Sequence, residues 1–205
     1  MNRTFRIASA LAAFLAVSSD AFAQGVSTSD PNAVKAGTYK VEPYHTQIGF
    51  SISHFGFTDF AGFFSGASGT LVLDPAKPSA AKLEVSIPTS SVLTTVSILD
   101  DELKGAKWFD APHYPAATFT STKVTLISAD SAEIVGNFTL HGVTKPVTLK
   151  AHLVGSGTNP LDKSFTVGFE ATGTIKRGDF DIKQYLPLVG DDVRLTISGA
   201  FVLQP

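Results

Sequence analysis

Histidine is the side chain best suited to proton transfer or metal binding near neutral pH. The 205-residue chain contains five: His45, His54, His113, His141 and His152. None of them forms an H-x-H or H-x-x-x-H pair, so their spacing predicts no metal site. His54 falls in an alternating pattern with Phe50 and Ile52, which puts its polar ring at the end of an apolar wall. We expect this ring either to hydrogen-bond the head group of a ligand or to be satisfied within the core or at its rim.

Phenylalanine is concentrated in one part of the chain. Six of the 16 phenylalanines fall in a stretch that glycines interrupt: Phe50, Phe55, Phe57, Phe60, Phe63 and Phe64. Phe63 and Phe64 cannot lie on the same side of a strand, because successive side chains point to opposite faces. We therefore expect these rings to line the wall and cover the mouth of an apolar ligand cavity. The alternative is that they only fill a hydrophobic core.

Motifs of known catalytic sites are missing from the sequence. It contains no G-x-S-x-G nucleophile turn, no G-x-G-x-x-G loop, no phosphate-binding P-loop and no H-E-x-x-H zinc motif. The acidic triplet Asp100-Asp101-Glu102 is typical of the first turn of a solvated helix. We therefore predict no catalytic residue and no metal. The alternative is an enzyme that uses His54 or His45 as a general base on a small apolar substrate.

Apolar and polar residues alternate with a period of two through most of the chain, which predicts about nine β-strands. The candidate strands cover residues 39–42, 48–54, 65–73, 82–87, 119–126, 133–140, 147–153, 165–171 and 193–198. Only residues 92–109 break the pattern, and residues 98–104 there indicate one or two helical turns. Since short turns join the strands, we predict one all-β domain with an antiparallel sheet that is curved or closed into a barrel.

The alternation does not decide which side of the strands faces inward. With the apolar side inside, such a barrel is a carrier in water; with that side outside, it is an outer-membrane barrel. Membrane barrels carry aromatic girdles at both interfaces, whereas this chain has one Trp and four Tyr. Charged residues at polar strand positions, such as Lys82, Glu84 and Lys150, also suit bulk water. We favour the carrier and keep the membrane barrel as the alternative.

The first 23 residues have the parts of a cleaved secretory signal peptide. Two arginines precede an apolar run from Ile7 to Val17, and Ala21-Phe22-Ala23 supplies an A-x-A cleavage site. This run is shorter than the ~20 apolar residues of a spanning helix, and no later window approaches that length, so we predict no integral membrane span. Residues 24–37 are small and polar and predict a flexible leader. The folded domain then covers residues 38–205.

Composition excludes several classes of protein. The absence of cysteine rules out disulfides, thiolate metal sites and cysteine nucleophiles. A net charge of −2 leaves no basic face for nucleic acid. An apolar fraction of 43% with 17% charged residues excludes a disordered chain. An exported protein of this kind must be held together by packing alone.

Several segments, in this order, resemble the YceI family of exported lipocalin-like barrels. They are residues 39–54, 64–66, 69–74, 103, 108–110, 114–115, 119–121, 136–147, 175–180 and 189–193. The most specific is the stretch from Gly136 to Val147, and together the segments cover essentially the whole chain beyond the leader. The sequence departs from the family pattern at Asp181, a place usually held by Gly, and at Pro43-Tyr44.

The resemblance implies an antiparallel eight-stranded lipocalin-like barrel in the periplasm, with a short helical insertion. It also implies an apolar tunnel that binds an isoprenoid chain, as in a polyprenyl lipid or an isoprenoid quinone, and no shared reaction or other cofactor. We expect the tunnel to be lined by Phe50, Ile52, His54, Phe64, Phe119, Phe138 and Phe169. His45 and Arg177 are the candidates for the head-group end. Whether two barrels pair as a homodimer, and whether the protein touches a membrane transiently, stay open.

Overall fold

The computed structural model of the chain describes residues 26–205. The predicted signal peptide, residues 1–23, and the first two residues of the predicted leader lie outside the described residues.

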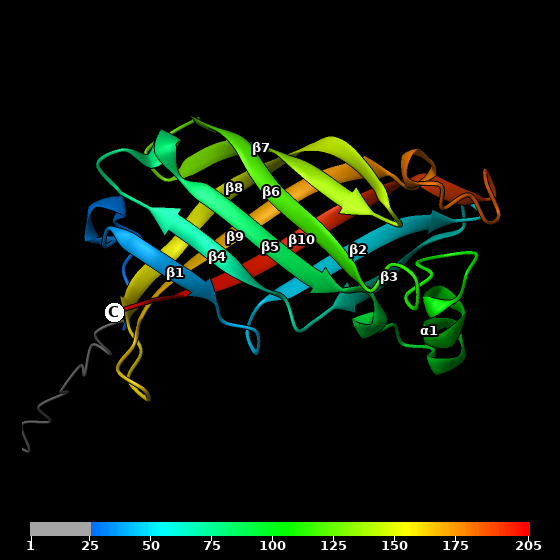
Figure 1. The fold of residues 1–205 in the computed structure, drawn as a ribbon, viewed down its shortest axis with the longest axis horizontal. Helices are drawn as coiled ribbons and strands as arrows, with labels where there is room; N and C mark the ends of the chain where they lie inside the picture. The colour runs from blue at the N-terminus through cyan, green and yellow to red at the C-terminus, as the bar shows by residue number, and fades with distance from the viewer. Residues whose placement is uncertain (1–25) are drawn as a thin grey trace, which may run out of the picture.

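Ten β-strand segments dominate the described chain (Figure 1). They are β1 (Gly37–Val41), β2 (Gln47–His54), β3 (Thr58–Phe64), β4 (Ser68–Leu73), β5 (Lys82–Pro88), β6 (Ala116–Leu126), β7 (Ser131–Leu140), β8 (Val143–Thr158), β9 (Phe165–Lys176) and β10 (Val189–Leu203). The helical elements of the same residues are α1 (Ser97–Lys104), η1 (Pro31–Ala33), η2 (Pro78–Ala80), η3 (Thr89–Ser91) and η4 (Arg177–Phe180). All paired strands run antiparallel, as the alternation and short turns predicted.

Two strands of the barrel are each broken into two segments. β1 and β2 both pair with β10, β1 through Lys40 and Val202 and β2 through Phe50 and Leu195. β4 pairs with β1, and β3 pairs with β2, so β3 and β4 also continue one another. Counted in this way, the sheet order β1-β4-β5-β6-β7-β8-β9-β10 returns to β1. The prediction of a closed, antiparallel eight-stranded barrel is confirmed.

The break between β1 and β2 is held against β10. The Glu42 N–H donates to the Ala200 carbonyl oxygen at 2.8 Å, and the Ala200 N–H donates to Thr46 Oγ1 at 3.1 Å. These bonds satisfy backbone groups that an interrupted strand would otherwise leave without partners. The chain can therefore bend at residues 42–46 while the barrel stays closed.

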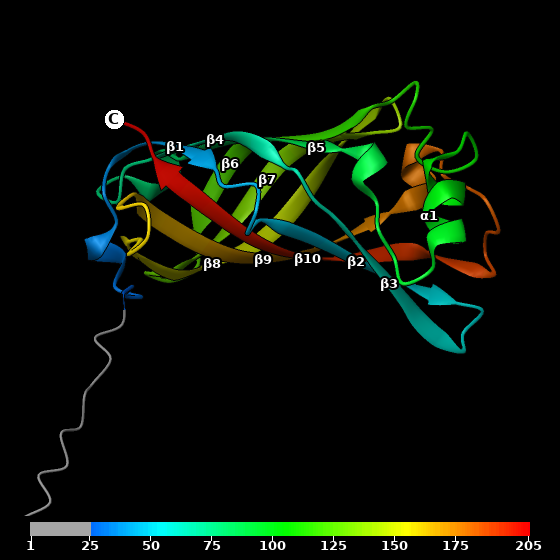
Figure 2. The same ribbon diagram turned by 90° about the horizontal axis from the view of Figure 1, so that it is seen from below.

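β3 is the strand that the sequence did not predict. Its seven residues include three Phe and one Gly and lack a regular apolar–polar alternation, so the period-two signal is weak. In space, β2 and β3 form a hairpin that projects past the rest of the barrel wall (Figure 2). The outer part of this hairpin therefore has no interior face to bury.

Helix α1 confirms the helical turns expected at residues 98–104 and belongs to a segment, residues 92–115, that we call the end cap. The two ends of the cap lie close together. Thr89, just before the cap, donates through its N–H to the Pro115 carbonyl at 3.0 Å and through Oγ1 to the Tyr114 carbonyl at 2.7 Å. Two backbone hydrogen bonds, of 2.8 and 2.9 Å, join Leu93 of the cap to Phe63 of β3. The cap lies across one end of the barrel, which we call the helical end (Figure 1).

The leader differs from the expectation of a flexible segment over residues 24–37. Thr28 and Ser156 exchange two backbone hydrogen bonds, of 3.0 and 2.8 Å, at the part of β8 that extends beyond its pairing with β7. Val34, after η1, is 7% exposed. The prediction of flexibility rested on the small polar residues of the leader itself. The order comes instead from β8, where Gly155 and Gly157 let this segment approach closely enough to pair as an added strand. Residues 26–36, the strap, lie at the opposite end of the barrel, the leader end (Figure 2).

The apolar side of the strands faces inward. Buried strand residues such as Ile48, Leu149 and Phe201 belong to one hydrophobic cluster, whereas Lys82, Glu84 and Lys150 are exposed. This is the orientation expected of the carrier alternative rather than of a barrel whose apolar side faces lipid. Within residues 26–205, no helix has the length and hydropathy needed to cross a membrane.

Candidate functional site, an apolar tunnel

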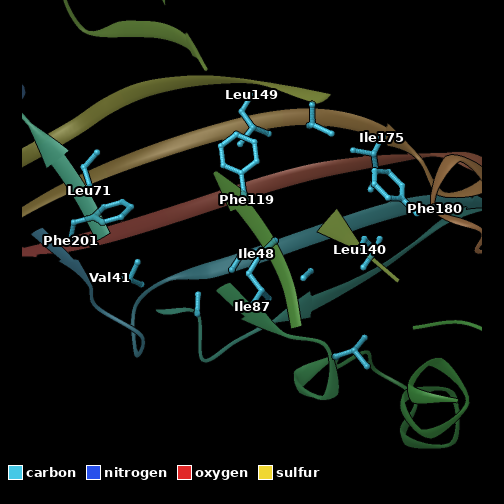
Figure 3. Packing of buried hydrophobic residues seen from close by; sticks show 14 of the residues in the cluster. Val41, Ile48, Leu71, Ile87, Phe119, Leu140, Leu149, Ile175, Phe180 and Phe201 are labelled. Carbon is cyan, nitrogen blue, oxygen red and sulfur yellow. The ribbon is translucent and has the colours of Figure 1, made fainter. Parts of the chain in front are cut away.

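The barrel encloses one elongated cavity of about 570 Å³. Alternate residues of nearly every strand line it, and Figure 3 shows part of this wall, from Val41 of β1 to Phe201 of β10. On β10 the lining runs from Val193 to Phe201, about 26 Å at about 3.3 Å per residue. The volume is within the range of about 300–1,000 Å³ that is usual for ligand sites. The long, narrow form suits a chain-like ligand.

Six of the seven predicted lining residues are in this wall. They are Phe50, Ile52, Phe64, Phe119, Phe138 and Phe169. The rings of Phe50 and Phe64 lie 5.7 Å apart, and Phe63, as the alternation requires, points outward and is half exposed. Glycine provides the room for two of these rings. A Cβ atom on Gly62 would lie 2.5 Å from the Phe50 ring, and one on Gly136 would lie 2.3 Å from the Phe119 ring.

The helical end of the tunnel is closed by aromatic residues that the sequence did not single out as site residues. Leu103, Trp108 and Phe109 of the end cap line the cavity. Phe109 packs edge-on against Phe64, with ring centres 5.2 Å apart, and Trp108 Nε1 donates to Glu102 Oε1 at 3.1 Å. The available signal was that Trp108-Phe109 falls in the stretch that breaks the strand pattern. Such a stretch crosses the end of a barrel instead of forming its wall.

Arg177, predicted for the head-group end, lies at this closed end and lines the cavity. Its side chain is 3% exposed, and the guanidinium lies 5.3 Å from the centre of the Trp108 ring. Three of its five N–H groups donate to backbone carbonyls, those of Gly190 (2.8 Å), Ile182 (2.9 Å) and Val189 (2.8 Å). One N–H on each terminal nitrogen is therefore left for another acceptor.

The charge of Arg177 has no carboxylate at ion-pair distance among residues 26–205. Burial lowers the pKa of Arg177, and the negative charge of Asp191 partly offsets this effect. Because arginine stays protonated in proteins, the closed end of an otherwise apolar tunnel carries a positive charge. An oxygen acceptor on a ligand would be stabilised there.

His54 lies outside the cavity, which differs from the expectation that it ends the apolar wall. It keeps the register of Phe50 and Ile52, but at this point the β2–β3 hairpin has passed the rim of the barrel, so His54 is exposed. Its ring packs on Phe55, with centres 4.4 Å apart. Strand periodicity gives the face of a residue but not where the enclosed volume ends.

His45, the other predicted head-group residue, is in the loop between β1 and β2, and its side chain is 81% exposed. Its Nδ1 lies 2.6 Å from Glu42 Oε2. The pKa of Glu42 lies below its usual value. Burial alone would raise it, but hydrogen bonds from the Tyr44 and His45 N–H groups and from the His45 ring together lower it by more. His45 therefore stabilises the loop at the break in the strand. Neither His45 nor His54 reaches the cavity, where a general base would meet an apolar substrate.

The leader end of the tunnel has a more polar rim. The residues that line the cavity there are Pro31, Asn32 and Val34 of the strap, Asp130 of the β6–β7 turn and Ser131 at the start of β7. Hydrogen bonds from the Ser128 and Ser131 hydroxyls lower the pKa of Asp130. Within residues 26–205, no group of three or more His, Cys, Asp or Glu side chains is arranged to hold a metal ion. The site is thus an apolar tunnel with a buried cation at one end and a polar rim at the other.

Comparison with known proteins agrees with this architecture. The family model of the YceI-like domain matches residues 39–201, which is most of the chain. The chain belongs to the YceI family. The protein YceI of Salmonella arizonae is 42% identical over 171 residues, which cover 82% of this chain and 88% of that protein. The resemblance inferred from the sequence motifs is confirmed.

Solved structures share the YceI barrel. A YceI protein of Campylobacter jejuni is 31% identical, with a TM-score of 0.66 over 75% of this chain and 91% of that one. BcnA of Burkholderia cenocepacia is 22% identical, with a TM-score of 0.70 over 78% and 98% of the chains. A polyisoprenoid-binding domain of Saccharophagus degradans is 14% identical, with a TM-score of 0.61 over 83% and 100%. The last two likenesses concern the fold.

Proposed function

We propose that this protein is a carrier that binds an isoprenoid lipid, either a polyprenyl lipid or an isoprenoid quinone, in the barrel tunnel after export to the periplasm. The observation that carries the proposal is the long apolar cavity with one buried cation at its closed end. The polyisoprenoid-binding domain of Saccharophagus degradans, with the same barrel, supports the ligand class. The signal peptide predicted for residues 1–23 supports the location.

Burial of apolar surface supplies most of the affinity in this proposal. Each Å² of ligand and wall removed from water contributes about 25 cal/mol, offset by the cost of ordering a flexible chain. Aromatic rings and branched side chains such as Phe138, Leu149 and Leu195 form an uneven wall, which suits a methyl-branched chain. The tunnel contributes few hydrogen bonds, so it selects for chain length and width rather than for polar detail.

The head group in this proposal lies at Arg177 rather than at His45 or His54. Arg177 is the residue of the three that lines the cavity. Its two remaining N–H groups would donate to a phosphate or carbonyl oxygen of the ligand. The Trp108 ring beside the guanidinium adds an aromatic surface for the same group.

Two matched substitutions on β9 test the tunnel. Ala171 lines the cavity, opposite Ala151 of β8, whereas its neighbour Thr172 is exposed on the outer face. Trp108 is the one tryptophan of the chain and lines the cavity, so its fluorescence reports quenching by a short-chain isoprenoid quinone. We expect Ala171→Phe to weaken binding about tenfold or more, the equivalent of about 1.4 kcal/mol, because its ring occupies the path of the chain.

Thr172→Phe is the control, and we expect its affinity to stay within about twofold of the original protein, since its ring points to water. Equal affinities for the two variants would contradict the proposal, as would a quinone that leaves the fluorescence of Trp108 unchanged at saturating concentration.

A further inference from the structure

An exposed apolar surface lies on two loops at the helical end of the barrel. It consists of Phe55 and Phe57 in the β2–β3 turn and Tyr185 and Leu188 in the loop after η4, and we call these four residues the end patch. They are 44%, 87%, 52% and 58% exposed, respectively. The loops are joined directly, because the Phe55 N–H donates to the Leu188 carbonyl at 2.8 Å. Figures 1 and 2 show both loops at the same end as α1.

The backbone holds two of these aromatic residues in an unfavourable conformation. Phe55 has φ 55° and Tyr185 has φ 59°, both in the left-handed region. For a residue with a bulky side chain this costs about 1–2 kcal/mol. The Phe55 ring packs on His54 and the Tyr185 ring lies beside Trp108, yet both residues stay about half exposed. Strained residues of this kind concentrate at functional sites.

The end patch is free of charge. Residues 54–58 and 184–189 contain no Asp, Glu, Lys or Arg. The charged residues that flank them are already paired: Lys183 with Asp181 at 2.7 Å, and Arg194 with Asp59. A partner that fits this surface is therefore apolar or zwitterionic, and the contact depends on burial rather than on ion pairing.

The size of the patch argues against a protein partner. A specific protein interface uses about 20–30 residues a side, whereas the end patch has four side chains on two loop tips. Four such side chains suffice for partial insertion into the interface of a bilayer, which needs no complementary shape. Tyrosine and phenylalanine are favoured at that depth.

The patch is also continuous with the closed end of the tunnel. The Tyr185 ring lies 6.2 Å from the Trp108 ring, which lines the cavity and covers the guanidinium of Arg177. The rings of Tyr185 and Trp108 therefore lie between the cavity and any surface that contacts the patch.

We propose that the end patch docks on the surface of a phospholipid bilayer, with Phe55 and Phe57 inserted among the head groups and the Trp108 end of the tunnel turned toward the membrane. The docking stands on the patch itself, whereas its purpose, the exchange of an isoprenoid lipid with the bilayer, rests on the proposed function.

Sedimentation of the mature chain with phosphatidylcholine vesicles tests the proposal. We expect the protein to pellet with the vesicles, in 0.5 M NaCl as in low salt, because the contact is uncharged. The double substitution Phe55→Ser with Phe57→Ser should lower the vesicle-bound fraction at least fivefold. The control is Leu161→Ser, which removes a side chain that is 90% exposed in the β8–β9 loop at the leader end and should bind as the original protein does.

Thermal unfolding of each variant shows whether it is folded, and quenching of Trp108 by the short-chain quinone measures tunnel binding independently. Vesicle binding lost with quenching intact supports the docking. Failure of the original protein to pellet overturns the docking but leaves the proposed function, which the quenching of Trp108 tests separately. An equal loss for Leu161→Ser, or a dimer that the double substitution dissociates without any vesicle binding, also overturns the docking.

Discussion

Arg177 carries a charge that the apolar wall around it cannot neutralise. Three backbone carbonyls and the face of Trp108 surround the guanidinium, and Asp191 stabilises its charge without forming an ion pair. The same hydrogen bonds tie η4, which follows β9, to both ends of the loop before β10, since Ile182 lies near the start of this loop and Val189 begins β10. Arg177 is therefore both a structural element of the helical end and the proposed contact for a head group.

Replacing this arginine by an apolar side chain of similar length should destabilise the fold. Arg177→Met leaves the carbonyls of Gly190, Ile182 and Val189 without their donors, and we expect the free energy of unfolding to fall by about 3 kcal/mol. Urea unfolding followed by circular dichroism measures the loss. The exposed Arg194→Met, which removes the surface ion pair with Asp59, should cost less than about 1 kcal/mol. Equal losses for the two variants would show that the carbonyl contacts of Arg177 contribute little.

The sequence predicted the apolar wall better than the polar positions. Phe50, Phe119 and Phe169 could be placed because period-two alternation fixes the face of each strand residue. His54 follows the same rule but lies past the rim, and the extent of an enclosed volume depends on contacts between strands distant in sequence. Asp181, where the family usually has Gly, has φ 61°. The departure from the family pattern therefore falls on a backbone position that favours glycine.

At the scale of elements, strand periodicity predicts neither the strap nor the position of the end cap. The end cap was visible as a break in the pattern, and its helix was predicted, but its position across the barrel was not. The strap has no periodic signal at all. It is ordered by backbone pairing with β8, which depends on the absence of side chains at Gly155 and Gly157 rather than on its own residues.

A methyl group at Gly157 should release the strap. Its Cβ would lie 2.1 Å from the Val26 carbonyl oxygen, so the added strand cannot keep its place in Gly157→Ala. We expect amide hydrogens of residues 26–34 to exchange about tenfold faster, the change that about 1.4 kcal/mol of lost protection produces. Hydrogen exchange with mass spectrometry measures this. In Gly168→Ala the nearest atom is 3.8 Å away, and protection should be unchanged; the same exchange in both variants would mean that Gly157 does not hold the strap.

At the scale of the whole molecule, the barrel closes without cysteine because β1 and β2, the two segments of one broken strand, both pair with β10. Alternation and turn signals were enough for an antiparallel all-β domain, and the family motifs were enough for eight strands. The sequence separated residues 39–42 from 48–54, but it could not show that these segments lie end to end along β10, because that depends on which strand lies beside them. The break at residues 65–67, between β3 and β4, was not predicted either. The result is a tunnel with a cationic, aromatic end and a polar end.

The central claim is that an isoprenoid chain occupies this tunnel. The most direct test is to purify the protein from the periplasm of a bacterial host, extract it with organic solvent and identify the lipid by mass spectrometry. The account predicts about one isoprenoid lipid per protein molecule, retained in Thr172→Phe and largely lost from Ala171→Phe. Folded protein that yields no isoprenoid lipid, or the same yield from both variants, would contradict it.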